Sequence, residues 1–189
     1  MPIDLEDIDG TAGQDNTAGI QQYIYLVDFR DVKTHPTFPK MEDAAKLEDL
    51  VTVTTDLVLK TATKPLRVKC TLEAGAATSD SQGEIDGMSF KNGLKFLIAG
   101  NKANADGFAR LAKNGDYYAV YFELDGAVRI LGHPGYPAKM VSAPGTTGEK
   151  TSDRKSRTFT FNSVWSGPAP IFTGKVMVDT VEQVLVYLA

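Results

Sequence analysis

The sequence is poor in the residues that most often build catalytic and metal sites. Its 189 residues include one cysteine, two histidines and one tryptophan. A single cysteine excludes a disulfide within the chain, and one cysteine with two histidines falls short of the ligands that a structural zinc site requires. Cys70 lies in the alternating run 66–72, a pattern that predicts a small buried hydrophobic residue. Such a chain suits folding in a reducing cytoplasm.

Long apolar runs and clusters of basic residues are also missing. No segment approaches the roughly 20 apolar residues of a transmembrane helix. Residues 1–9 have neither the basic start nor the apolar centre of a signal peptide. We therefore expect no membrane insertion and no secretion by the standard route. The 20 basic residues are scattered among 24 acidic ones, with a net charge of −4, so the sequence lacks the basic patch typical of nucleic-acid readout.

Motifs for chemistry fail when they are tested residue by residue. Residues 145–151 have the composition of a phosphate-binding loop, but Glu149 interrupts the Gly-Lys-Thr series that this loop needs. Residues 7–10 suggest a calcium loop, yet its first and last ligand positions carry no acid. His133 lies in a turn rich in glycine and proline, with no nucleophile or carboxylate identified beside it. We predict no catalytic residue, no cofactor and no metal, and a hydrolase stays a remote alternative.

The pattern of apolar residues predicts a mainly β fold. Alternating segments rich in valine, isoleucine and aromatic residues indicate about nine or ten strands. Two short helices are expected, at residues 41–50 and 104–113. Together these elements predict a β-sandwich or open barrel with long loops. The expected strands are residues 23–29, 51–59, 66–72, 84–90, 94–99, 117–124, 128–131, 138–142, 157–162 and 170–173, with one long or two short strands in 176–188.

Turn and loop signals divide the chain further. Asp125-Gly126 is the strongest hairpin signal, and Asn92-Gly93 predicts a second hairpin. Residues 73–83 are small and polar and predict a long loop. Residues 1–19 carry five acids and no base, which predicts a flexible acidic N-terminal arm. Residues 20–189 are then expected to form a single β-sandwich domain.

The C-terminal third is the most informative part of the sequence. Residues 145–156 form a polar loop that we expect to be disordered in the free subunit and ordered at an interface. Phe159 and Phe161 alternate with polar residues and should face inward from a central strand. Trp165 lies among glycine and proline residues. It can be a core anchor under the end of the sheet or an exposed anchor at an interface.

This third of the chain carries a resemblance to a known group of proteins. The residues concerned are Asp125-Gly126, the series 129–132 (Arg-Ile-Leu-Gly), Thr147-Gly148, Ser152-Asp153-Arg154, the series 157–161 (Arg-Thr-Phe-Thr-Phe) and Pro168-Ala169-Pro170-Ile171-Phe172. In this order they resemble virion structural proteins of phages and prophages of Bacteroidetes bacteria. The resemblance covers about residues 94–173, and no family is suggested by the first 90 residues.

The resemblance implies a virion protein, and the expected architecture is similar to that of a tail tube subunit. Such subunits form hexameric rings that stack into a DNA conduit. On this analogy residues 73–83 and 145–156 would be stacking loops, and residues 1–19 an arm ordered by a neighbour. Lys150, Asp153, Arg154 and Trp165 are the candidate subunit contacts. The partners would be copies of the chain and other virion proteins, with DNA passing through the lumen without sequence readout, which a mildly acidic balance would suit.

Two alternatives remain open from the sequence. A head decoration protein or a head–tail connector needs the same sheet and arm in a different symmetry. A carbohydrate-binding β-sandwich would place Trp165, Tyr117 and Tyr136 on one exposed face.

Overall fold

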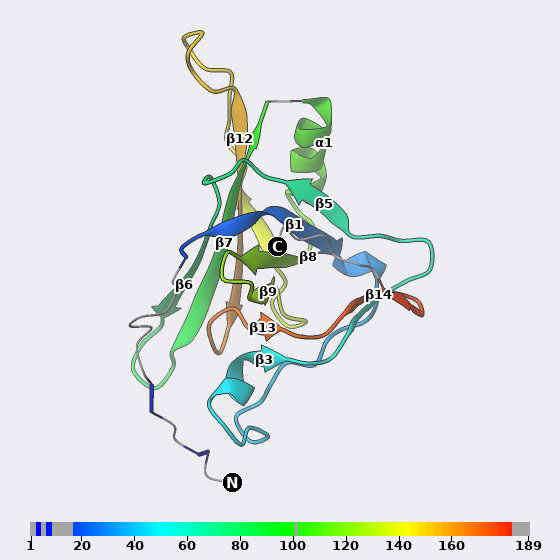
Figure 1. Cartoon of the computed structure of the whole chain (residues 1–189), viewed down its shortest axis with the longest axis vertical. Helices are drawn as coiled ribbons and strands as arrows, with labels where there is room; N and C mark the ends of the chain where they lie inside the picture. The colour runs from blue at the N-terminus through cyan, green and yellow to red at the C-terminus, as the bar shows by residue number, and fades with distance from the viewer. Residues whose placement is uncertain (1–2, 5–6, 9–16, 101, 183–189) are drawn as a thin grey trace.

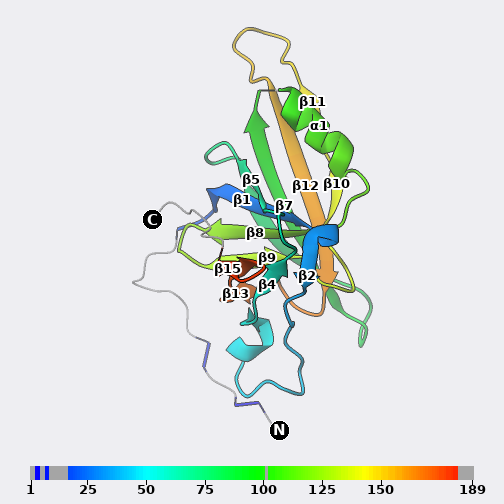
Figure 2. The ribbon, with the colours of Figure 1, turned by 90° about the vertical axis from the view of Figure 1, so that its right-hand side faces the viewer.

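The computed structural model describes residues 3–4, 7–8, 17–100 and 102–182. Within these ranges the chain forms fifteen strands, one α-helix and two short 3-10 helices. The mainly β, sandwich-like fold predicted from the sequence is confirmed. Three sheets make up the fold (Figures 1 and 2), and we call them the central, long and small sheets.

The central sheet has the strand order β3-β13-β9-β8-β1-β5. The long sheet has the order β10-β12-β7-β6, with β11 also paired to β12, and the small sheet has the order β15-β14-β4-β2. The central strands are β1 (Ile20–Asp28), β3 (Thr52–Val53), β5 (Leu66–Lys69), β8 (Tyr117–Glu123), β9 (Val128–Leu131) and β13 (Ile171–Phe172). The long sheet contains β6 (Ala76–Gln82), β7 (Ser89–Ala99), β10 (Lys139–Ser142), β11 (Gly145–Thr146) and β12 (Ser156–Trp165). The small sheet contains β2 (Val32–Thr34), β4 (Leu57–Leu59), β14 (Val176–Val178) and β15 (Val181–Glu182). The helices are α1 (Ala103–Ala112), η1 (Phe29–Asp31) and η2 (Glu48–Val51).

The central sheet is buried on both faces. Successive side chains of a strand point to opposite faces, and in β8 they enter two different cores. Tyr117, Ala119 and Tyr121 belong to the core shared with the long sheet. The alternate residues of β8, Tyr118, Val120 and Phe122, belong to the core shared with the small sheet. This double burial explains why β8 is an unbroken apolar run instead of an alternating one.

Aromatic rings fill the core between the central and long sheets. Phe159 and Phe161 of β12 are fully buried, as predicted. Their rings lie against Phe96 of β7, with centroid distances of 5.5 and 6.0 Å. Helix α1 covers one end of this core, where the ring centroid of Phe108 lies 5.4 Å from that of Phe159. The inner face of the long sheet is therefore dry and closely packed.

The small sheet completes the second core and joins distant parts of the chain. Leu57 and Leu59 of β4 are fully buried there, beside Val32 and Val176. Strand β14 runs parallel to β4, and β13 runs parallel to β3. Parallel neighbours cannot be joined by a tight hairpin, so these contacts depend on the whole intervening chain.

Several local predictions are confirmed. The Asp125-Gly126 turn joins β8 to β9, with Gly126 at a φ of 97° and the Asp125 carboxylate accepting from the Ala127 amide at 3.0 Å. The predicted helix at residues 104–113 is α1. Cys70 is buried, and its thiol donates to the carbonyl of Gln22 at 3.1 Å.

The prediction of a helix at residues 41–50 is wrong, because the short 3-10 helix η2 is the only helical element in that segment. The Asp49 carboxylate accepts hydrogen bonds from the amides of Ala45 and Lys46, at 3.0 and 2.9 Å. An acidic side chain that binds backbone amides in this way offers the chain an alternative to helical hydrogen bonds. The prediction of two helices therefore holds for one.

The strands of the long sheet also differ from the prediction. Residues 73–83 do not form a long loop, because most of them belong to β6. Asn92-Gly93 is no hairpin and lies inside the continuous strand β7. A β-carbon on Gly93 would lie 2.8 Å from the hydroxyl oxygen of Thr78 and 3.2 Å from the amide oxygen of Asn162. The glycine therefore lets the side chains of two neighbouring strands approach closely.

The two ends of the chain are described in part. Asp4 of the expected arm donates its backbone N–H to the carbonyl of Ala45 at 2.9 Å and forms a parallel bridge with Lys46. Most of the predicted arm 1–19 lies outside the described residues. At the other end, β14 and β15 occupy the first part of the predicted strand 176–188, and residues 183–188 lie outside the described part.

Candidate assembly interface

The outer face of the long sheet is polar. On β12, Thr158, Thr160 and Asn162 alternate with the buried phenylalanines and so point away from the core. Thr160 lies opposite Lys95 of β7, and farther along the same face Lys91 of β7 lies opposite Asp80 of β6. These side chains are partly or fully exposed, and none belongs to either core. Figure 1 shows the sheet running along one side of the molecule.

The two edges of the long sheet are available for pairing. Strand β6 pairs with β7 over seven residues, and on its other side no described strand is hydrogen-bonded to it. Strand β10 is the opposite edge, and along Lys139–Ser142 it pairs with β12 alone among the strands that the structure describes. Such edges present backbone N–H and C=O groups to a further strand. The sheet can therefore be extended in both directions.

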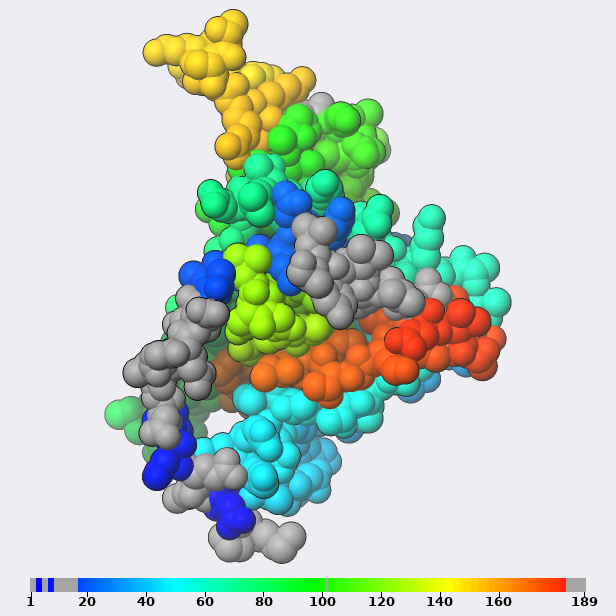
Figure 3. Space-filling view, viewed as in Figure 1, coloured from blue at the N-terminus to red at the C-terminus, as the bar shows by residue number. Residues whose placement is uncertain are grey.

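A hairpin stands at one end of the long sheet. Its base is the pairing of β11 with the start of β12, and in Figure 3 it extends beyond the body of the molecule. At its tip the Asp153 carboxylate accepts from the amides of Lys150 and Glu149, at 2.9 and 3.0 Å. These hydrogen bonds hold the pKa of Asp153 below its usual value. We expected residues 145–156 to be disordered in the free subunit, whereas the structure has them in a hydrogen-bonded hairpin.

The predicted contact residues separate into two groups. Lys150, Asp153 and Arg154 all lie exposed on the hairpin, with Asp153 closing its turn. Trp165 is the last residue of β12, about 30 Å away along the strand. It is half-buried against the core of the small sheet, with its ring 5.7 Å from that of Phe38. Trp165 therefore occupies the position expected of a core anchor, apart from the three hairpin residues.

The aromatic face required by the carbohydrate-binding alternative is not present. Tyr117 is only 3% exposed and belongs to the core behind the long sheet. Trp165 packs against the other core, and only Tyr136 is strongly exposed, at 51%. The prediction that these three rings share one exposed face is wrong, because two of them supply apolar surface to separate cores.

Sequence reasoning missed the turn at the opposite end of the long sheet, between β6 and β7. Gly87 donates its amide to the carbonyl of Glu84 at 3.0 Å, and Asp86 has a positive φ of 67°. Asp86-Gly87 is itself a hairpin-favouring dipeptide. Its signal was hidden because residues 84–90 were assigned to a strand. The turn leaves Ile85 91% exposed and Met88 60% exposed.

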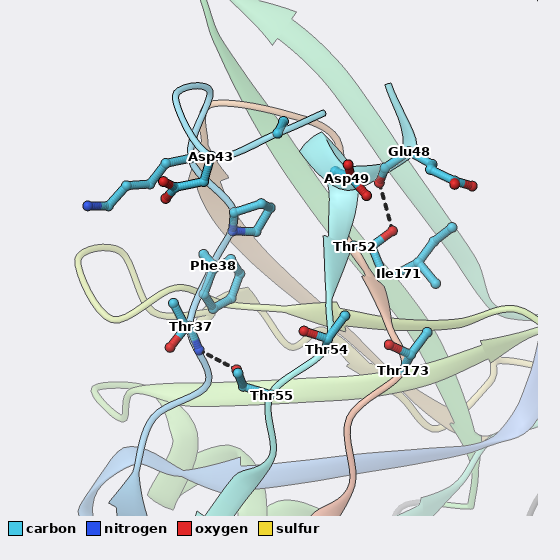
Figure 4. Close-up of a pocket in the computed structure, with 13 residues that line it drawn as sticks. Thr37, Phe38, Asp43, Glu48, Asp49, Thr52, Thr54, Thr55, Ile171 and Thr173 are labelled. Atoms are coloured by element: carbon cyan, nitrogen blue, oxygen red, sulfur yellow. Dashed lines mark hydrogen bonds between the residues drawn. The ribbon is translucent and has the colours of Figure 1, made fainter. Parts of the chain in front are cut away.

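A cavity of about 550 Å³ lies between residues 37–55 and β13 (Figure 4). Its wall contains several threonines, but the hydroxyl groups of at least two of them are already hydrogen-bonded to backbone groups. The Thr52 hydroxyl donates to the carbonyl of Glu48 at 2.7 Å, and that of Thr55 accepts from the amide of Thr37 at 2.6 Å. Asp49, also in the wall, binds two backbone amides as described above. These three side chains stabilise the local fold.

His133 and Cys70 are both hydrogen-bonded to backbone groups. Burial lowers the pKa of His133, whose Nδ1 accepts from the Gly135 amide at 3.0 Å within the turn. Burial also raises the pKa of the Cys70 thiol, which keeps it protonated and unreactive. Among the residues that the structure describes, no three His, Cys, Asp or Glu side chains are arranged to hold a metal ion. The same part of the chain has no helix long and apolar enough to cross a membrane.

The strongest candidate for a functional surface is therefore the long sheet with its two edges and its two ends. Comparisons with protein-family models, with curated proteins and with solved structures found no match to this chain. The interpretation of the surface consequently depends on its own geometry and chemistry.

Proposed function

We propose that the protein is a bacteriophage virion subunit, most consistent with the tail tube, that acts by self-association and not by catalysis. One observation carries the proposal: the long sheet has a dry inner face, a polar outer face and two edges on which no further strand of the described residues pairs. Pairing β6 of one subunit with β10 of the next would continue the sheet through a ring. A ring of this kind is closed by symmetry and leaves no edge exposed.

The outer face of the sheet would line the lumen of such a ring. Its threonine and asparagine side chains offer hydrogen bonds without a fixed charge. Lys91 lies opposite Asp80 in the strand register, so part of the charge on this face of the sheet is balanced. A lumen with little net charge would let a polyanion slide, because neither strong attraction nor strong repulsion acts on it. This lining differs from the acidic lumen expected from the overall charge, since Lys95 adds a further base.

The test is whether rings depend on the edge of the sheet. Purified protein should form rings in negative-stain images, and the variant Thr78→Lys/Asp80→Lys should stay monomeric. Lysines on an edge strand oppose pairing, and here they would meet Lys139 on the neighbouring β10. The control Glu42→Lys/Thr61→Lys makes the same change in net charge on exposed residues far from the sheet. Rings that persist in the edge variant, or a wild-type protein that never forms rings, would contradict the proposal.

A further inference from the structure

The two ends of the long sheet carry opposite charges. The hairpin end has three exposed bases, Lys150, Arg154 and Lys155, and two exposed acids, Glu149 and Asp153, so its net charge is +1. The turn end has Glu84 and Asp86, also exposed, and a net charge of −2. None of these side chains forms an ion pair with another described residue. Both ends therefore keep their charge available for a partner.

The two ends cannot satisfy each other within one molecule. β7 and β12 are paired from Ser156–Ala99 at the hairpin end to Trp165–Phe90 at the turn end. This ladder separates the ends by about 30 Å, several times the Debye length of about 8 Å at physiological ionic strength. The sheet is packed along this length against the central sheet, so it cannot fold back on itself. Only another molecule can bring the two ends together.

Each end is also held in a fixed shape. Asp153 closes the hairpin tip, and a β-carbon on Gly148 would lie only 2.8 Å from the β-carbon of Asp153. The turn is closed by the hydrogen bond from Gly87 to Glu84. A contact between two preorganised elements loses less conformational entropy than a contact between mobile loops.

We propose that the turn 84–88 of one copy docks against the hairpin 145–156 of a second copy, head to tail. Glu84 and Asp86 would pair with Lys150 and Arg154. Ile85 would pack on the aliphatic stems of those same basic side chains, which can cover apolar surface while their charged ends stay in water. The contact uses different surfaces on the two copies, so it repeats and generates a linear stack.

This contact deepens the proposed function, because it supplies the axial association that would turn rings into a tube. The axial contact is also distinct from the proposed ring contact, since lateral pairing uses the edges β6 and β10 and axial docking uses the ends of the sheet. The two can therefore be broken separately.

Charge reversal at each end provides the experiment. The hairpin variant is Lys150→Glu/Arg154→Glu, and the turn variant is Glu84→Lys/Asp86→Asn, in which asparagine retains the tolerance for positive φ needed at position 86. Each variant alone should lose axial stacking in sedimentation velocity and in negative-stain images, with association weakened roughly tenfold or more at low salt. An equimolar mixture should stack again with the two variants alternating. The acidic hairpin of one variant then meets the basic turn of the other at one junction, and their unchanged turn and hairpin meet at the next.

A matched control is Lys64→Glu/Lys113→Glu, which makes the same change in net charge as the hairpin variant on exposed residues outside both ends. It should stack like the wild type. Circular dichroism should show each variant folded. Stacking that survives in both end variants, a mixture that fails to recover, or a wild-type chain that never associates end to end would overturn the inference. If the wild type stacks end to end while the β6 edge variant still forms rings, the inference stands and the proposed ring closure through β6 and β10 is contradicted.

Discussion

Replacing Phe161 with alanine should destabilise the protein by about 3–5 kcal/mol. Phe161 is fully buried, with its ring plane at 6° to that of Phe96 and its centroid 5.9 Å from that of Tyr117. A buried phenylalanine removes roughly 150–250 Å² from water. At about 25 cal/mol per Å² this gives an upper bound of about 4–6 kcal/mol. Alanine keeps part of that burial, which lowers the area-based estimate, whereas the lost ring contacts and the cavity raise it. The area-based estimate therefore agrees with the loss of about 3–5 kcal/mol expected for truncating a buried phenylalanine.

Urea unfolding followed by circular dichroism measures this loss. The fluorescence of Trp165 gives a second probe, because it is the only tryptophan in the sequence and packs against the other core. Both signals should report one transition at a lower urea concentration if the two cores unfold together. Leu111→Ala is the control, since Leu111 is 60% exposed on α1 and its loss should change stability by less than about 0.5 kcal/mol. A loss under about 1.5 kcal/mol for Phe161→Ala would refute the packing of the long sheet on the central sheet.

Two further predictions concern backbone strain and pH. Gly126→Ala should destabilise by about 1–2 kcal/mol through its positive φ alone, because nothing lies within 4 Å of the added β-carbon. Gly132→Ala should be worse by at least about 1 kcal/mol, since its β-carbon would lie 2.7 Å from the Tyr117 carbonyl oxygen; equal losses in urea unfolding would contradict this. Burial lowers the pKa of both His35 and His133, so the unfolded chain binds protons that the folded chain does not as the pH falls below about 6.5. Stability should therefore decrease from about pH 7.5 to about pH 5.5, and the variant His35→Gln/His133→Asn should show a shallower decrease by urea unfolding; an unchanged slope would exclude the histidines as its cause.

The fold could be predicted where local chemistry and long-range packing agree. Asp125-Gly126 marks a real turn because its backbone requirement is local. Asn92-Gly93 carries the same signal but lies within β7, where the glycine serves the approach of Thr78 and Asn162. That requirement comes from neighbouring strands and is invisible in the local sequence. β6 was missed for a related reason, since its small polar residues are held by backbone hydrogen bonds to β7.

The candidate interface could be predicted in part. Lys150, Asp153 and Arg154 do lie together on an exposed hairpin, because all three belong to one polar segment between strand signals. Trp165 could not be separated from them by sequence, since a lone tryptophan can serve in a core or at an interface. The complementary turn with Ile85 went unnoticed because its importance follows from its position at the far end of the sheet. Position relative to a distant segment is a property of the topology and not of the residues.

The mixing of early and late strands in the sheets has a consequence for how the chain folds during synthesis. β1 lies beside β8 in the central sheet, and β13 and β14 lie beside β3 and β4, which are more than 100 residues earlier in the chain. Pairings over such sequence separations form slowly. Until β14 has been synthesised, Leu57 and Leu59 of β4 lack the strand that pairs beside them in the second core. Incomplete chains should therefore aggregate, and slow expression at low temperature should increase the yield of assembly-competent protein.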